Sequence, residues 1–151
     1  MELLNAVNQL NIPIMISNGM STFEEMINPL KYFNNITTFL HCNSSYPSNP
    51  AELDLNAIKT FKNMYPNLKI GYSGHEIGYF PTVIAVAVGA EVIERHFTLD
   101  HNMEGTDQKA SLEPHEFKKM VENIYKAITV LGNFYPSIYP AEEKIKEKLR
   151  K

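Results

Sequence analysis

The sequence is poor in cysteine, in positive charge and in long apolar runs. Cys42 is the only cysteine among 151 residues, so the chain can form no internal disulfide, and a reducing compartment such as the cytoplasm is expected. The formal net charge of −3 provides no basic field for nucleic acid. The longest apolar run, residues 83–90, is too short to span a bilayer, and the N-terminus lacks the basic start of a signal peptide. We therefore expect neither nucleic acid nor a membrane as a partner.

What the chain does contain is a globular composition, with 44% hydrophobic and 21% charged residues. Its length is sufficient for one domain with a core. Short segments rich in β-branched and aromatic residues predict buried strands. These expected strands cover residues 12–17, 36–42, 68–73 and 91–97.

Helical patterns separate these strands. Thr22 and Glu25 form a predicted capping box, Asp54 is an expected helix cap, and Pro81 suits a helix start that Gly89 ends. The expected helices cover residues 3–10, 22–33, 54–65, 81–88 and 114–131, and the charged tail after them is a helix or a linker. Such alternation indicates parallel strands joined by crossover helices. It is compatible with a small open sheet or with half of an eight-stranded barrel.

Polar residues collect where the strands end, which is where function gathers in α/β folds. Alternation along a strand places Ser73 and His75 on one side, and it places Glu94 and His96 on one side of the next strand. Since neighbouring strands lie about 4.8 Å apart, both imidazoles could reach one divalent cation. Two histidines with oxygen ligands suit manganese, magnesium or cobalt better than a closed zinc cage. The alternative is two unrelated loop histidines.

The other charged groups near these strand ends have simpler interpretations. His41 is expected to face the inside or to pack structurally, and His101 and His115 are expected to lie at the surface. Strand alternation turns Arg95 away from Glu94, toward the helices. The loop of residues 100–114 is either a solvated turn or part of the site.

Five motifs together resemble one known family, the sialic acid synthases, which condense phosphoenolpyruvate with an N-acylated hexosamine. They occur in the order and at the spacing of that family, from about residue 3 to residue 132, and they read ISNGMST, LHCNSSYP, GYSGHE, VIERHFTLD and GTDQKASLEP. The resemblance implies an α/β fold, the C-terminal half of a TIM-type (β/α)8 barrel with parallel strands 5–8. Residues 1–133 would form this partial barrel. Residues 134–151 would be a linker toward a C-terminal antifreeze-like domain that the chain lacks.

The resemblance also implies roles for individual residues. His75 and His96 match metal ligands, with manganese expected first and magnesium or cobalt as alternatives. Glu94 matches a carboxylate that faces the same cavity and is the candidate for proton transfer. The expected substrate-binding residues are Ser17, Ser44, Tyr46 and Ser73, which match positions for phosphoenolpyruvate or the sugar, and Asp107, which matches a contact to the amino sugar.

The implied chemistry is attack of the enol carbon of phosphoenolpyruvate on the open-chain sugar aldehyde, followed by attack of water and release of phosphate. The family's full barrel supplies lysines from four earlier strands. We therefore expect a truncated or split enzyme that pairs with an N-terminal half barrel or with another copy. Two alternatives remain: a non-catalytic subunit for sugar binding or assembly, and a half-barrel metal-dependent hydrolase.

Overall fold

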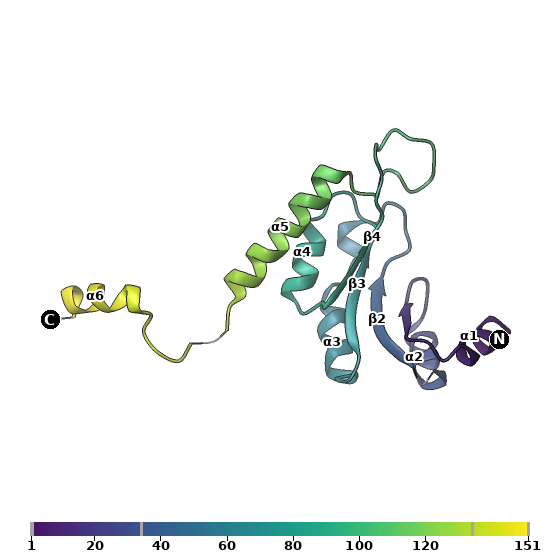
Figure 1. The fold of residues 1–151 in the computed structure, drawn as a ribbon, viewed down its shortest axis with the longest axis horizontal. Coiled ribbons are helices and arrows are strands. Elements are labelled where there is room, and N and C mark those ends of the chain that lie inside the picture. The colour runs from purple at the N-terminus through teal and green to yellow at the C-terminus, as the bar shows by residue number, and fades with distance from the viewer. Residues whose placement is uncertain (1, 34, 134, 151) are drawn as a thin grey trace.

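The computed structural model describes residues 2–33, 35–133 and 135–150. A curled four-stranded sheet lies at its centre, with the strands in the order β1-β2-β3-β4 and all neighbours parallel (Figure 1). The strands are β1 (Ile14–Ser17), β2 (Ile36–Cys42), β3 (Lys69–Gly74) and β4 (Val92–Arg95). Three of them lie inside segments predicted from the sequence, and β3 extends one residue beyond its predicted end at residue 73, so the alternation of strands and helices is confirmed.

Helices follow each of the four strands. They are α2 (Phe23–Tyr32), α3 (Asn56–Met64), α4 (Phe80–Ala87) and α5 (Pro114–Leu131), with α1 (Glu2–Gln9) before the sheet, α6 (Pro140–Leu149) in the tail and a short 3₁₀ turn at Pro50–Glu52. The predicted capping box of Thr22 and Glu25 begins α2. The predicted cap of α3 is wrong: Leu55 occupies that position without a side-chain bond. Asp54 instead has a left-handed φ of 42°, which turns the chain into the helix.

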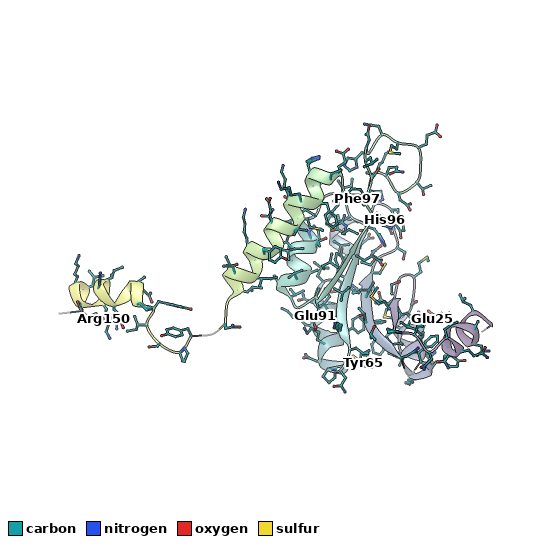
Figure 2. All side chains as sticks on the ribbon, viewed as in Figure 1. Glu25, Tyr65, Glu91, His96, Phe97 and Arg150 are labelled. Atoms are coloured by element: carbon teal, nitrogen blue, oxygen red, sulfur yellow. The ribbon has the colours of Figure 1, made fainter. Side chains whose placement is uncertain are left out.

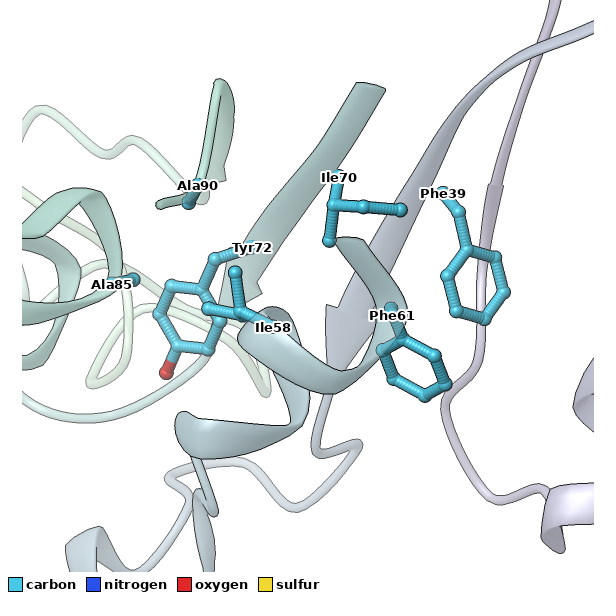
Figure 3. Close-up of a cluster of buried hydrophobic side chains, with 7 residues drawn as sticks. All are labelled: Phe39, Ile58, Phe61, Ile70, Tyr72, Ala85 and Ala90. Carbon is cyan, nitrogen blue, oxygen red and sulfur yellow. The ribbon is translucent and has the colours of Figure 1, made fainter. Parts of the chain in front are cut away.

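The core lies between the sheet and the helices on its outer face. Phe39 of β2 and Phe61 of α3 meet edge to face, with ring centroids 4.9 Å apart, a favoured geometry for aromatic pairs. Burial of this layer fixes which side of each strand faces the helices. The buried cluster consists of Phe39, Ile58, Phe61, Ile70, Tyr72, Ala85 and Ala90 (Figure 3).

The inner face of the sheet is only partly filled. Leu40 and Val92 close over Gly71, where an added Cβ would lie 2.4 Å from Leu40 Cδ2 and 2.5 Å from the Val92 carbonyl oxygen. Toward the β1 edge, by contrast, Met15 is 60% exposed. The strands β1 and β4 are the two edges of the sheet, so a further strand could pair with each of them on one side.

The tail contains a helix, α6, which lies apart from the sheet, at the left of Figure 1. The domain boundary predicted between residues 133 and 134 involves residue 134, which lies outside the described residues, and it stays a prediction. In the described ranges, none of the helices combines the length and the apolar character needed to cross a membrane.

Candidate functional site

Four polar side chains converge where β3 and β4 end. Ser73 and Glu94 are partners in the register of these strands, and Ser73 Oγ donates a 2.7 Å hydrogen bond to Glu94 Oε1. Two residues after Ser73 and Glu94 come His75 and His96, and their ring centroids lie 5.1 Å apart. Figure 2 shows His96 at one end of β4 and Glu91 at the other end. The strand alternation in the sequence thus correctly predicted which side chains come together.

A backbone carbonyl determines which nitrogen of His75 carries the proton. Nδ1 of His75 lies 2.7 Å from the carbonyl oxygen of Asn43. Because that oxygen can only accept, Nδ1 carries the proton and Nε2 keeps its lone pair. Nε2 faces the Tyr46 hydroxyl at 3.1 Å and Ser73 Oγ at 3.5 Å. This arrangement, with one ring nitrogen donating to a carbonyl and the other keeping its lone pair, is typical of metal-ligating histidine.

Tyr46 covers both imidazoles. Its ring lies 4.2 Å from the ring of His75 and meets the ring of His96 edge to face at 5.4 Å. Burial, reinforced by the negative charges of Cys42, Asp107 and Glu94, raises the pKa of the Tyr46 phenol. The phenol therefore remains protonated and can donate to Nε2 of His75.

The loop between β4 and α5 brings Asp107 to the same place. Asp107 Oδ2 lies 3.7 Å from His96 Nδ1, and Ser111 Oγ donates to the Asp107 carbonyl at 2.9 Å. The base of the loop is fixed because the amide of Leu112 donates to the His96 carbonyl at 2.8 Å. Asp107 thus lies beside the histidine expected to bind a metal.

The two remaining predicted contacts lie further from the histidines. Ser44 Oγ is 3.7 Å from the sulfur of Cys42 and borders a cavity of about 500 Å³ at the ends of β1 and β2. Ser17 is exposed at the end of β1 and pairs with Leu40 in the sheet register, so β2 separates it from β3. The structure therefore places six of the eight predicted residues around the histidines or beside them and leaves Ser44 and Ser17 toward the β1 edge, at the same carboxyl end of the sheet.

The other histidines have structural partners. His41 Nε2 lies 2.7 Å from the carbonyl of Leu53, on the helix side of the sheet, as expected for a packing residue. His101 is more firmly held than a surface residue, since its ring bonds the Gln108 carbonyl and Glu116 at 2.9 Å each. His115 is exposed.

Sequence reasoning missed two features of the site. The carbonyl of Asn43 has no side-chain signal, because any residue at that position has the same carbonyl group. Glu76 stands in the GYSGHE motif, yet no role followed for it from the sequence. It is fully buried and bonds Arg95 behind the site, which confirms that Arg95 turns toward the helices and away from Glu94.

The donor set suits a hard divalent cation whose coordination sphere is completed by substrate or water. Residues 2–33, 35–133 and 135–150 contain no group of three or more histidine, cysteine or acidic side chains arranged to hold a metal ion. Two imidazoles beside oxygen donors fit manganese, magnesium or cobalt, whereas structural zinc requires four protein ligands. The fit rests on the lone pair of His75 Nε2, which faces Tyr46 and Ser73, and on the nearby ring of His96.

Comparison with known proteins gives the family. The model of the NeuB family matches residues 1–135. The chain belongs to the NeuB family. It is 39% identical over 142 residues to human N-acetylneuraminate-9-phosphate synthase, covering 92% of this chain and 40% of that protein. It is 38% identical over 130 residues to N,N'-diacetyllegionaminic acid synthase of Legionella pneumophila, covering 81% and 36%.

A solved structure of this NeuB-type fold matches the chain closely. The crystal structure of N-acetylneuraminic acid (sialic acid) synthetase from Leptospira borgpetersenii superposes with a TM-score of 0.86 at 33% identity, covering 99% of this chain and 54% of that one. The predicted fold, half of a TIM-type barrel with parallel strands, is therefore confirmed. The chain spans 36–44% of the length of the curated relatives it matches.

Proposed function

We propose that the chain supplies the metal- and sugar-binding part of a nonulosonic acid synthase site, which condenses phosphoenolpyruvate with an N-acyl hexosamine. The observation that supports this most is the placement of the His75 and His96 rings, 5.1 Å apart, next to the hydrogen bond from Ser73 to Glu94. The curated relatives named above are synthases of N-acetylneuraminate 9-phosphate and N,N'-diacetyllegionaminic acid. The sugar is N-acetylmannosamine, its 6-phosphate or a related N-acyl hexosamine.

Glu94 is the proposed proton-transfer group. The reaction joins C3 of phosphoenolpyruvate to the sugar aldehyde carbon, adds water at C2, and breaks the bond between C2 and the phosphate oxygen. Water loses both protons in this sequence: the aldehyde oxygen gains one, and the released phosphate takes the other. Ser73 donates to Oε1 of Glu94, which orients the carboxylate and leaves Oε2 to accept the proton from water, a role typically worth about 10²–10⁴-fold in rate.

The charges around the site favour the binding of a cation. Glu94 and Asp107 carry negative charge toward the site, and the guanidinium of Arg95 is held on the other side of the sheet by Glu76. A divalent ion, manganese first, held by His75 Nε2 and His96, would polarise the aldehyde oxygen when bound. His75 is prepared for this role because Asn43 holds its other nitrogen.

The remaining residues are proposed to hold the substrates. Asp107 binds the amino sugar next to His96, and the Tyr46 hydroxyl orients the substrate above His75. Ser44 borders the cavity of about 500 Å³ at the ends of β1 and β2, and Ser17 lies at the end of β1. This cavity leaves room for the rest of the sugar.

The proposed partner is an N-terminal half barrel or a second copy of the chain. The edge strands β1 and β4 each have a neighbouring strand on one side only among the described residues. Such open edges favour pairing with strands of another chain. The lysines expected to bind the anionic substrate would come from that half.

The test is a reconstitution. The 151-residue chain is mixed with the separately produced N-terminal barrel half of the human relative, and phosphate release from phosphoenolpyruvate is measured. We expect release only when an N-acyl hexosamine and manganese are both present. Release that needs no sugar would contradict the proposal and favour a hydrolase. No release with any N-acyl hexosamine would favour a non-catalytic subunit.

A further inference from the structure

A buried ion pair lies behind the candidate site. Arg95 Nη1 donates to Glu76 Oε1, and both side chains are fully buried. Burial lowers the pKa of the Arg95 guanidinium, while the charge of Glu76 opposes this effect and keeps the guanidinium protonated. The function proposed above uses neither residue.

The hydrogen bonds of this pair extend into four parts of the fold. Tyr72 of β3 donates to Glu76 Oε2 at 2.8 Å, and Arg95 Nη1 donates to Thr82 of α4 at 2.8 Å. Arg95 Nη2 donates to the Glu76 carbonyl at 2.8 Å and to the Ala110 carbonyl at 3.3 Å. One guanidinium therefore connects β4 to the end of β3, to α4 and to the loop that carries Asp107.

The pair lies one residue from each histidine. Glu76 directly follows His75, and Arg95 directly precedes His96, so the contact behind the sheet fixes the backbone at both ligands. Gly74 is the register partner of Arg95, and a Cβ added there would lie 2.8 Å from Glu76 Oε2. The network is thus packed tightly against the strand that carries His75.

His96 particularly needs such an anchor. The strand β4 ends at Arg95, so His96 lies beyond the part of the strand that pairs with β3. Its own carbonyl accepts from Leu112 in the following loop, and that loop is bonded through Ala110 to Arg95. The position of the His96 ring therefore depends on Arg95 through the preceding residue and through the loop.

Net stability alone does not explain such a pair. Desolvation of two buried charges offsets much of their attraction, and apolar replacement of both partners is often neutral or stabilising. Directional hydrogen bonds at fixed partners do, however, restrict geometry more than apolar contacts do. We therefore attribute to this pair the effect of fixing the positions of the segments that it bonds: the end of β3, α4 and the loop that carries Asp107.

We propose that Glu76 and Arg95 are positioning residues that set the separation of the His75 and His96 imidazoles and hold the loop that carries Asp107. The metal-binding consequence rests on the proposed function. The geometric consequence does not, because the separation of two rings is measurable without a metal.

The test uses the full chain labelled with ¹⁵N-histidine. The double variant Glu76→Gln/Arg95→Met removes both charges at similar volume, and Arg95→Lys keeps the charge but loses the fork that reaches two carbonyls. The matched control is Lys62→Met/Glu91→Gln, which removes the exposed ion pair that joins α3 to the residue before β4. Glu91 lies at the opposite end of β4 from His96 (Figure 2).

Three quantities are measured: the urea midpoint of unfolding, the nuclear Overhauser effect between the His75 and His96 rings without metal, and manganese affinity. We expect the double variant to keep a cooperative urea transition, to lose the ring-to-ring signal and to bind manganese about 10–100-fold more weakly, the range found when groups that orient metal ligands are removed. Arg95→Lys should weaken the same signal, and the control should change neither the signal nor the affinity.

Several results would overturn the proposal. A double variant that keeps the ring-to-ring signal would show that the pair does not position the histidines. So would absence of the signal in the unmodified chain, or unfolding of both the double variant and Arg95→Lys, which would show a role in folding alone. If the unmodified chain binds no manganese, the proposed metal site is wrong, and the ring-to-ring signal still decides the positioning role.

Discussion

Nδ1 of His75 lies 2.7 Å from the carbonyl oxygen of Asn43. This one contact sets the tautomer of the imidazole and directs Nε2 toward Tyr46 and Ser73. It joins the loop after β2 to the loop after β3, so the segments that follow two strands together orient the His75 ring. Such outer contacts typically change metal affinity by about 10–100-fold when lost.

Removal of either histidine should weaken metal binding. His75→Ala and His96→Ala each delete one of two proposed protein ligands, so we expect manganese affinity to fall by more than about tenfold in calorimetric titration. His115→Ala is the matched control, because His115 is exposed at the start of α5. Unchanged affinity in both site variants would exclude the two-histidine site.

Glu94 and Asp107 should differ in their kinetic effects in the reconstituted enzyme. Glu94→Gln keeps the size of the side chain and loses proton transfer, so kcat should fall by about 10²–10⁴-fold. Asp107→Ala should mainly raise the KM for the N-acyl hexosamine, because Asp107 is assigned to substrate binding. Steady-state phosphate release separates the two constants. Equal changes of both constants in both variants would indicate structural roles instead.

The loop that carries Asp107 should loosen at alkaline pH. The bond to the Gln108 carbonyl, opposed by burial and assisted by Glu116 and Glu113, raises the pKa of His101 above its ordinary value of 6.5. A raised folded-state pKa means that protonated His101 stabilises the loop fully below about pH 6.5, and that this contribution is lost as the pH rises through the folded-state pKa.

Limited proteolysis measures this effect, because Lys109 is exposed in the same loop and is a site for trypsin. Cleavage after Lys109, corrected for the pH dependence of trypsin with a peptide standard, should accelerate as the pH rises above 6.5. His101→Gln should cleave at one corrected rate throughout. A corrected rate in the unmodified chain that does not change with pH would contradict this role of His101.

The open inner face of the sheet should drive association. Met15 is 60% exposed on β1, an edge strand, and open edges with apolar neighbours pair with other chains. Sedimentation velocity at several concentrations should therefore show self-association that Met15→Lys reduces. A compact monomer at all concentrations would favour a self-sufficient small α/β domain.

The sequence contained most of the fold because local patterns and burial agreed. Period-2 alternation in β3 and β4 correctly placed Ser73 with Glu94, and it turned Arg95 to the other side. The capping box of Thr22 and Glu25 marked the start of α2 at Phe23. These features depend on nearest neighbours and on which face is buried, and both are visible in a sequence.

Features that depend on contacts between distant segments were not visible. Asp54 has the residue type of a helix cap, but the chain turns there with a positive φ and Leu55 takes the cap position. Glu76 resembles a solvated loop acid until Arg95, from another strand, is brought behind it. Ser17 lies at the end of β1, yet only the strand order shows that β2 separates it from the histidines.

The most direct test of the synthase function is the fate of the water oxygen. In the reconstituted enzyme, reaction in H₂¹⁸O with phosphoenolpyruvate, an N-acyl hexosamine and manganese is followed by mass spectrometry of the released phosphate. Attack of water at C2 breaks the bond between carbon and oxygen, so we expect phosphate without ¹⁸O. Phosphate that carries one ¹⁸O would show attack at phosphorus and would contradict the condensation that Glu94, His75 and His96 are proposed to serve.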